Sequence, residues 1–122
     1  MTLFVQNIAF DCDDAYTVGS FWSAVFGLPL MDDDKPGDPV AVIRREGGNL
    51  YFERVPEAKT VKNRVHLCLQ AGKNRDAECE RMLALGATIV DDRRHLKEDG
   101  GWCVFADPEG NEFCVLGRAA TS

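Results

Sequence analysis

Few side chains in this sequence can carry a proton near neutral pH, and its two histidines are the first to consider. Histidine ordinarily titrates close to neutrality, which suits it to general acid or base catalysis. His66 lies in the alternating segment 64–69, whereas His95 lies in a charged loop where exposure to solvent is expected. His66 is therefore the candidate catalytic residue. The alternative, a histidine that only holds a strand through a hydrogen bond, is equally open.

The cysteines offer a second kind of chemistry, because thiolates act as nucleophiles and as ligands of soft metals. They are odd in number and dispersed, with no Cys-x-x-Cys pair: Cys12, Cys68, Cys79, Cys103 and Cys114. This distribution is typical of reduced thiols that pack as small apolar residues. A reactive thiol needs an electropositive neighbour. The sequence identifies none, so Cys114 is predicted to pack in the core.

The composition is that of an ordinary globular protein of 122 residues, with 45% apolar and 28% charged residues. Its net charge of −6 argues against nucleic acid or an anionic membrane as partner. No apolar run approaches the roughly 20 residues that span a bilayer. The N-terminus lacks the charged start and long apolar block of a signal peptide. These features predict a cytoplasmic protein.

The positions of the candidate residues depend on a pattern of strands and helices that occurs twice. Residues 5–12 alternate between apolar and mixed side chains, as a half-buried strand does. Acidic Asp13 and Asp14 then begin a helix, which continues as an apolar stripe and ends at Gly27. Three further strands are predicted in this half, at 28–31, 40–45 and 50–55. The first half therefore has the order β-α-β-β-β.

The same order restarts after the polar segment 56–62, which is the predicted linker. The second half is predicted to contain a strand, a helix and three strands, at 64–69, 76–85, 88–90, 102–106 and 112–116. Gly48-Asn49 and Gly110-Asn111 occupy matching turns ahead of the last strand of each half. A duplicated module explains both halves. A generic α+β sandwich with an accidental likeness between its halves is the alternative.

The paired modules resemble the vicinal oxygen chelate superfamily, which includes glyoxalases, bleomycin-resistance proteins and extradiol dioxygenases. The resemblance rests on Phe21-Trp22 in the first helix and on the segments 52–57, 62–67 and 107–116. Within the superfamily the chain looks most like the short glyoxalase-like domain proteins. The motifs indicate the superfamily and do not select one activity.

The resemblance implies an α+β fold in which two tandem βαβββ modules form a curved, cup-like mixed sheet with the helices outside. The modules would span about 3–56 and 63–117 of a single domain, residues 1–122. Members of the superfamily commonly pair through such modules, so a homodimer is expected. The chemistry is expected inside the cup.

The resemblance also implies where a metal would bind, because metal-using members take one ligand from the first and last strand of each module. The corresponding residues here are Asn7, Phe52, His66 and Cys114. A divalent metal that activates vicinal oxygens needs about three nitrogen or oxygen donors. His66 is one good donor, Cys114 is soft, Asn7 is weak and Phe52 is none. A metal-free site without cofactor is therefore predicted, with one divalent metal ion at His66 as the alternative.

The lining of the cup depends on the register of the strands. A shift of one residue would bring in Glu53 instead of Phe52, because successive residues of a strand point to opposite faces. The match of the two Gly-Asn turns argues against that shift, unless a bulge intervenes. With this register, Cys68 also lines the cup but is given no role. The side chains predicted to bind a ligand are Asn7, Asp11, Phe52, Arg54, His66, Gln70, Trp102 and Cys114.

These expectations define one leading function and two alternatives. The chain is predicted to bind a small organic molecule, with Phe52 stacking on it and His66 orienting or deprotonating it. Sequestration and acid–base chemistry are both open, and an enzyme would be a glyoxalase-like lyase or isomerase. The first alternative is a metal-dependent lyase, isomerase or dioxygenase, with His66 and Glu53 or Glu112 as ligands. The second is a structural or interaction module.

Overall fold

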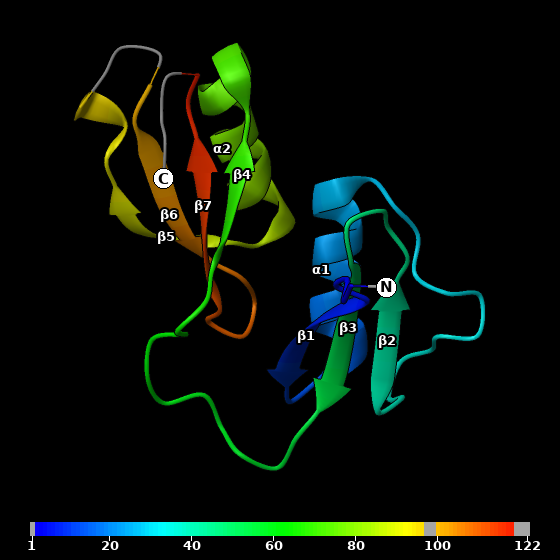
Figure 1. Cartoon of the computed structure of the whole chain (residues 1–122). Helices are drawn as coiled ribbons and strands as arrows, with labels where there is room; N and C mark the ends of the chain where they lie inside the picture. Colours follow the sequence, from blue (N-terminus) through cyan, green and yellow to red (C-terminus); the bar gives the residue numbers. More distant parts are fainter. Residues whose placement is uncertain (1, 97–99, 119–122) are drawn as a thin grey trace. The chain divides into compact units, whose positions relative to one another are not determined.

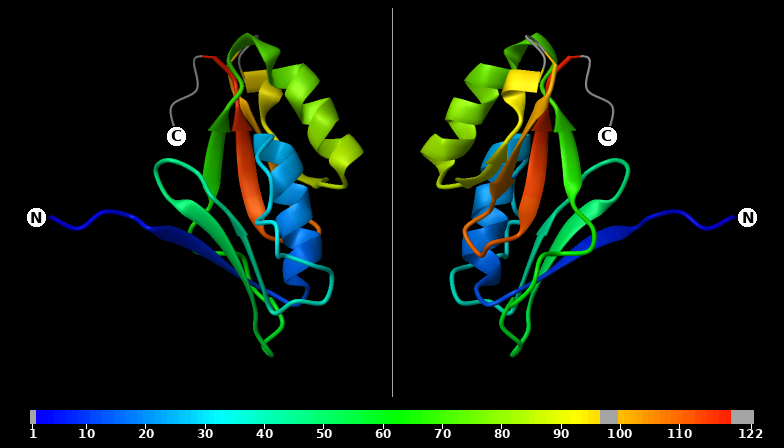
Figure 2. Two further views of the ribbon diagram at one scale, coloured as in Figure 1. Left: turned by 90° about the vertical axis from the view of Figure 1, so that its right-hand side faces the viewer. Right: turned by 90° about the vertical axis from the view of Figure 1, so that its left-hand side faces the viewer.

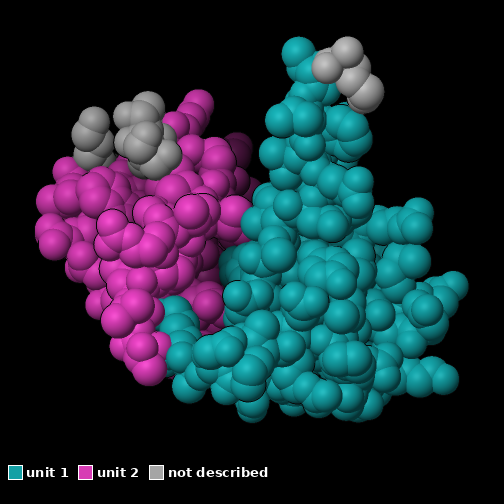
Figure 3. Space-filling view, turned by 60° about the horizontal axis from the view of Figure 1, so that its bottom comes forward, with its two compact units in different colours: residues 1–59 teal, residues 60–122 magenta. Residues whose placement is uncertain are grey.

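The computed structural model describes residues 2–96 and 100–118 of the chain. It consists of two compact units, residues 1–59 and 60–122, which Figure 3 colours separately. The boundary lies inside the segment 56–62 that was predicted as a linker. In each unit a helix packs on one face of a small sheet (Figure 1). The predicted α+β class with tandem modules is thus confirmed, whereas the cup shared by both modules remains a prediction.

Unit 1 holds a three-stranded sheet and one helix. Its elements are β1 (Asn7–Cys12), α1 (Ala15–Phe26), β2 (Val40–Ile43) and β3 (Asn49–Arg54). The strand order is β1-β3-β2, in which β1 runs parallel to β3 and β2 pairs with β3 antiparallel. The helix connects β1 to β2 and contacts both β2 and β3.

The ends of α1 follow from single residues. Asp14 is the N-cap, and its carboxylate accepts a hydrogen bond of 3.1 Å from the backbone N–H of Thr17. That bond is the main reason why the pKa of Asp14 is lowered. Gly27 ends the helix in the left-handed conformation, with φ of 65°, which costs glycine little. The residues predicted to bound the helix therefore do so.

The core of unit 1 lies between α1 and one face of the sheet. Phe10 of β1 packs against Trp22 of α1 and Phe52 of β3, with ring centroids 5.4 and 5.1 Å apart. Phe52 and Trp22 have no exposed surface. The helix approaches closely at Gly19, where an added Cβ would lie 3.3 Å from the Phe52 ring. Phe10 and Phe52 therefore belong to the helix-facing side of the sheet.

Unit 2 holds a four-stranded sheet with the order β4-β7-β6-β5. Its elements are β4 (Leu67–Gln70), η1 (Gly72–Asn74), α2 (Arg75–Leu85), β5 (Thr88–Asp92), η2 (Arg94–Leu96), β6 (Trp102–Ala106) and β7 (Glu112–Leu116). The strands β4 and β7 are parallel, and the other neighbours are antiparallel. Figure 2 shows α2 on one face of this sheet. Among the described residues no helix is long and apolar enough to cross a membrane.

The core of unit 2 lies between α2 and the sheet. Phe105 and Phe113 stack on adjacent strands with centroids 5.7 Å apart, and both are fully buried. Cys79 and Met82 of α2 are buried as well. The turn between β6 and β7 is held by the buried carboxylate of Asp107.

Two predicted strands differ from the structure. The segment 28–31 forms only a single bridge, between Leu30 and Ile43, although the Met31 N–H also bonds to the Val42 carbonyl. Further pairing is replaced by side chains, since the Asp34 carboxylate accepts from the Val42 N–H and Ser23 Oγ donates to the Leu28 carbonyl. The strand predicted at 64–69 begins only at Leu67. Before it, Asn63 occupies the backbone groups that a longer strand would pair, since its side chain bonds to Val65 and Glu112.

Candidate functional site

The sheet of unit 2 has a second face, opposite α2, where most of the predicted site residues of this unit lie. The register pairs Cys68 with Cys114, Gln70 with Leu116, and Leu116 with Trp102. The intervening residues, such as Phe113 and Val115, face the helix and are buried. We call the second face the His66 face; it consists of His66, Cys68, Gln70, Trp102, Cys114 and Leu116. The structure therefore brings His66, Gln70, Trp102 and Cys114 together on one face.

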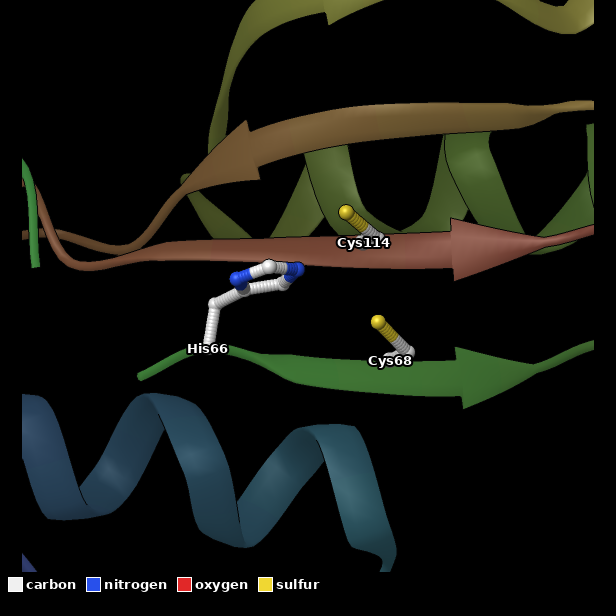
Figure 4. A group of neighbouring side chains, drawn as sticks. All are labelled: His66, Cys68 and Cys114. Carbon is white, nitrogen blue, oxygen red and sulfur yellow. The ribbon is translucent and has the colours of Figure 1, made fainter. Parts of the chain in front are cut away.

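A compact cluster lies on this face. One ligand atom from each of His66, Cys68 and Cys114 lies within 4.8 Å of the others. Figure 4 shows His66 on the segment that leads into β4, Cys68 on β4 and Cys114 on β7, with the ring and both sulfur atoms close together. Within the described part of the chain this is the single group of at least three His, Cys, Asp or Glu side chains with such spacing.

Backbone pairing and one asparagine position the cluster. Cys68 and Cys114 are directly opposite each other on adjacent parallel strands. The segment ahead of His66 is tied to β7 by Asn63, whose backbone N–H donates to the Glu112 carboxylate at 3.1 Å and whose side-chain oxygen accepts from the Glu112 N–H at 2.8 Å. Glu112 is thus committed to Asn63, which argues against its predicted alternative role as a metal ligand.

The three side chains differ in burial and so in chemistry. His66 is exposed, Cys68 is intermediate and Cys114 is buried. Burial first, and then the neighbouring Cys68, raises the pKa of the Cys114 thiol to about 11. At neutral pH Cys114 is therefore a thiol and a poor nucleophile. The predicted packing role of Cys114 agrees with its burial.

The corresponding face of unit 1 carries different groups. Asn7, Ala9 and Asp11 alternate along β1 on the side opposite α1, and the register sets Tyr51 beside Ala9 and Glu53 beside Asp11. We call this the Asn7 face; it consists of Asn7, Ala9, Asp11, Asn49, Tyr51 and Glu53. The Asn7 side chain accepts a hydrogen bond of 3.3 Å from Asn49. Asn7, Asp11 and Glu53 are exposed.

The predicted position of Phe52 is wrong. Phe52 lies in the core of unit 1, on the face opposite Asn7, so it does not line a ligand site there. Arg54 follows the same alternation; it pairs in register with Cys12 and lies close enough to Asp14 to lower the pKa of that carboxyl. It is therefore on the opposite side of the sheet from Asp11.

The error comes from the length of a turn. Across the hairpin of unit 1, Ile43 pairs with Leu50, whereas in unit 2 the equivalent pair is Phe105 and Phe113, one residue further apart in sequence. Because side chains alternate along a strand, one residue more or fewer in the turn moves every following side chain to the other face of the sheet. The matching Gly-Asn turns therefore do not align the strands behind them. Tyr51 and Glu53 therefore lie on the face where Phe52 and Arg54 are predicted from the sequence.

The donors of the His66 face do not fit the oxygen-chelating divalent metal that the superfamily resemblance implies. Such ions prefer nitrogen and oxygen donors, and this face offers one imidazole with two thiols. Of the four residues mapped from the resemblance, Phe52 is buried in a core and cannot ligate. Cys68 was placed in the lining by sequence, but its proximity to His66 and Cys114 was missed, because nothing local in the sequence indicates that β4 pairs with β7.

Comparison with known proteins gives a consistent result. The profile of the family described as "Glyoxalase-like domain" matches residues 7–116. A search of curated protein sequences found no match. Among solved structures, a glyoxalase/bleomycin resistance/dioxygenase family enzyme from Burkholderia phytofirmans PsJN aligns with a TM-score of 0.74 at 16% identity, covering 93% of this chain and 98% of that one.

Two further solved structures are similar. The E126Q mutant of the fosfomycin resistance protein FosX from Listeria monocytogenes, solved with Mn(II) and 1S,2S-dihydroxypropylphosphonic acid, aligns with a TM-score of 0.73 at 16% identity, over 98% of this chain and 93% of that one. The oxidase ChaP-H2 aligns with a TM-score of 0.69 at 20% identity, covering 100% of this chain and 98% of that one. At these identities the likeness is one of fold.

Proposed function

The chain belongs to the family of glyoxalase-like domain proteins, and on that premise we propose that it binds a small organic molecule on the His66 face, without a resident oxygen-chelating metal ion. The observation that carries the proposal is the exposed imidazole of His66 on one sheet face with Gln70 and the half-buried indole of Trp102. An apolar wall with a few converging polar groups is how small-molecule sites are built.

Each of the three side chains has a distinct part in binding. Trp102 supplies a flat apolar surface for a planar ligand, which is the part predicted for Phe52 from the sequence. The Gln70 side-chain oxygen already accepts a hydrogen bond of 2.8 Å from the Gly72 N–H, so its amide NH₂ is the group left to donate to a ligand. Within the described residues His66 has no hydrogen-bond partner, so both ring nitrogens are available to bind and to exchange a proton.

This arrangement favours acid–base chemistry over a structural role for His66. A histidine that only stabilises a strand is expected to be buried and bonded, and His66 is exposed. An acidic C–H or O–H group of the bound molecule is the natural proton donor to it. The parts of Asn7, Asp11 and Arg54, which belong to unit 1, remain predictions, as do the homodimer and the cytoplasmic location.

The metal-dependent alternative has less support. A lyase, isomerase or dioxygenase that activates vicinal oxygens, as the superfamily resemblance implies, needs mainly oxygen and nitrogen ligands around an open coordination position. The His66 face supplies one nitrogen donor and two thiols. The structural-module alternative predicts that no small molecule stabilises the protein.

The test is a thermal-shift screen of small planar acids, ketones and phosphonates in the presence of a chelator. A ligand at about one hundred times its Kd stabilises the folded chain by about 2.7 kcal/mol, so binding is measurable. His66→Ala and Trp102→Ala are expected to abolish the shift, and His95→Ala, which removes the other histidine, is expected to keep it. A screen without any stabilising compound, or equal shifts in all variants, would contradict the proposal.

Light scattering tests the homodimer in the same preparation. A mass near 13.5 kDa, that of one chain, would exclude it.

A further inference from the structure

We propose that His66, Cys68 and Cys114 form a binding site for one thiophilic divalent ion of the zinc class, with two thiolates and one imidazole as ligands and a fourth position open. The three ligand atoms lie within 4.8 Å of one another and come from a single unit of the chain. This inference goes beyond the function proposed above and does not depend on it.

The spacing is close to what such an ion requires. Zinc binds sulfur at about 2.3 Å and imidazole nitrogen at about 2.0 Å, so ligand atoms around a tetrahedral zinc lie about 3.8 Å or less apart. The largest separation in the cluster, 4.8 Å, therefore has to shorten by about 1 Å. Rotation of exposed His66 and half-buried Cys68 can supply this movement without displacing a strand.

The scaffold presents the two sulfur atoms in advance. Cys68 and Cys114 are paired residues of adjacent parallel strands, so their backbones are held by the sheet. His66 lies on the segment that leads into β4, and its ring lies beside the two sulfur atoms (Figure 4). A fixed pair of sulfur atoms with one adjustable imidazole needs little reorganisation to receive an ion.

The donor set selects a soft ion. Thiolate ligands favour zinc and its softer relatives, whereas magnesium, calcium and manganese prefer carboxylates, carbonyls and water. Two cysteines and one histidine with an open position make up a known kind of zinc site in enzymes. The charge of the ion also compensates the two thiolates, which would otherwise be unfavourable at the buried Cys114.

The other neighbouring pair of thiols in unit 2 makes a useful contrast. Cys79 of α2 and Cys103 of β6 are close enough to interact, and burial first raises the pKa of Cys103 to about 12. Both are fully buried, and they are not part of any cluster with a histidine among the described residues. An ion has no exposed ligand through which to enter there, so binding is expected only at the His66 cluster.

The test uses the full chain, reduced with a phosphine and stripped with a chelator. Equilibrium dialysis against zinc with elemental analysis is expected to give one ion per chain. Cadmium titration is expected to produce the ultraviolet charge-transfer absorption of cadmium–thiolate bonds. Cys68→Ser, Cys114→Ser and His66→Ala are each expected to weaken binding by about tenfold or more. His95→Ala and Cys12→Ser, which remove a histidine and a thiol outside the cluster, are expected to bind as the parent does.

Circular dichroism shows whether each variant folds. A second measurement, made on the parent protein, keeps the test valid if a variant does not fold. In the parent protein, zinc is expected to protect Cys68 from alkylation, as mass spectrometry of peptides reports, and removing the zinc restores its reactivity. The proposal is overturned if equilibrium dialysis finds less than about one zinc ion per ten chains, or if cadmium binds without thiolate absorption. It is also overturned if His95→Ala loses as much zinc binding as the variants of the cluster. Ligand binding in the presence of chelator is unaffected by these outcomes, so the two proposals fail independently.

Discussion

The sheet of unit 1, β1-β3-β2, corresponds in strand order and direction to β4-β7-β6 of unit 2, which adds β5 at the edge. The two units carry different chemistry on the face opposite their helix. The Asn7 face of unit 1 bears oxygen groups, from Asn7, Asp11, Tyr51 and Glu53. The His66 face of unit 2 bears an imidazole and two sulfur atoms. The helix-facing sides are alike, since each places phenylalanines from adjacent strands in contact. A repeated scaffold therefore predicts the core of each unit and leaves the functional groups of each face to be established separately.

The turn ahead of the last strand decides which residues reach each face. The hairpin of unit 1 is one residue shorter than that of unit 2, as the pairs Ile43–Leu50 and Phe105–Phe113 show. Phe52 consequently points to α1 and Tyr51 to the Asn7 face. The largest expected effect of a mutation on stability follows from this placement of Phe52 and Tyr51 on opposite sides of the sheet.

Phe52→Ala is expected to lower the free energy of unfolding by about 3–5 kcal/mol, the usual loss for a buried aromatic residue truncated in a packed core. Phe52 has no exposed surface and contacts Phe10, and its ring lies beside Gly19 of α1. Urea unfolding followed by circular dichroism measures the change. Ligand binding by the folded fraction is expected to stay intact, because Phe52 does not line the His66 face.

Tyr51→Ala is the matched control, with an expected loss of about 1 kcal/mol for a half-buried side chain. If Tyr51→Ala proved the more damaging change, or if Phe52→Ala left stability intact and abolished ligand binding, Phe52 would belong to the ligand site after all.

Much of the fold could be predicted from the sequence where one local signal acts alone. The strands 102–106 and 112–116 match at both ends, because two apolar runs flank a Pro-x-Gly turn. The helix from Asp14 to Gly27 is bounded by its own caps. The segment 28–31 forms only one bridge to β2, because the Asp34 carboxylate accepts from the Val42 N–H and Ser23 Oγ donates to the Leu28 carbonyl.

The candidate site was harder to predict, since it depends on long-range pairing. His66 could be identified by residue type and spacing, but its proximity to Cys68 and Cys114 requires β4 to lie beside β7. No periodicity reports which strands become neighbours. To predict the face on which Phe52 lies, the number of residues in the turn before β3 must be known. The positions of the glycines alone do not give that number.

The turn of unit 2 is expected to be the more sensitive of the two hairpins. Asp107 is buried, and one of its carboxylate oxygens accepts hydrogen bonds of 2.9 Å from the backbone N–H groups of Glu109 and Asn111. Asp107→Ala leaves these donors without that partner, with an expected loss of about 2–3 kcal/mol. In unit 1, Asn49→Ala removes two neutral bonds, one from the Arg45 N–H and an exposed one to the Asn7 side chain, at about 1 kcal/mol. Denaturant unfolding of the two variants measures which loses more free energy of unfolding. Equal losses would contradict the greater sensitivity of the turn of unit 2.

The smallest expected effect concerns two carboxylates with lowered pKa values, one in each unit. The Arg94 side chain, through a hydrogen bond of 2.7 Å, is the main reason why the pKa of Asp92 falls to about 2. In Asp14 the main cause is the Thr17 N–H instead.

Because the folded pKa of Asp92 lies below its unfolded value near 3.9, ionised Asp92 stabilises the fold above that value. This stabilisation is lost as the pH falls from there through about 2. The Asp92 side chain is 39% exposed, so solvent screening holds the contribution below about 1 kcal/mol. The Arg94→Ala substitution is expected to raise the pKa of Asp92 toward its ordinary value and to leave the pKa of Asp14 unchanged. Carboxyl NMR titration measures both values. An Asp92 that titrates near 3.9 in the parent protein would show that this ion pair does not form in solution. A change in Asp14 would show that the two units are electrostatically coupled.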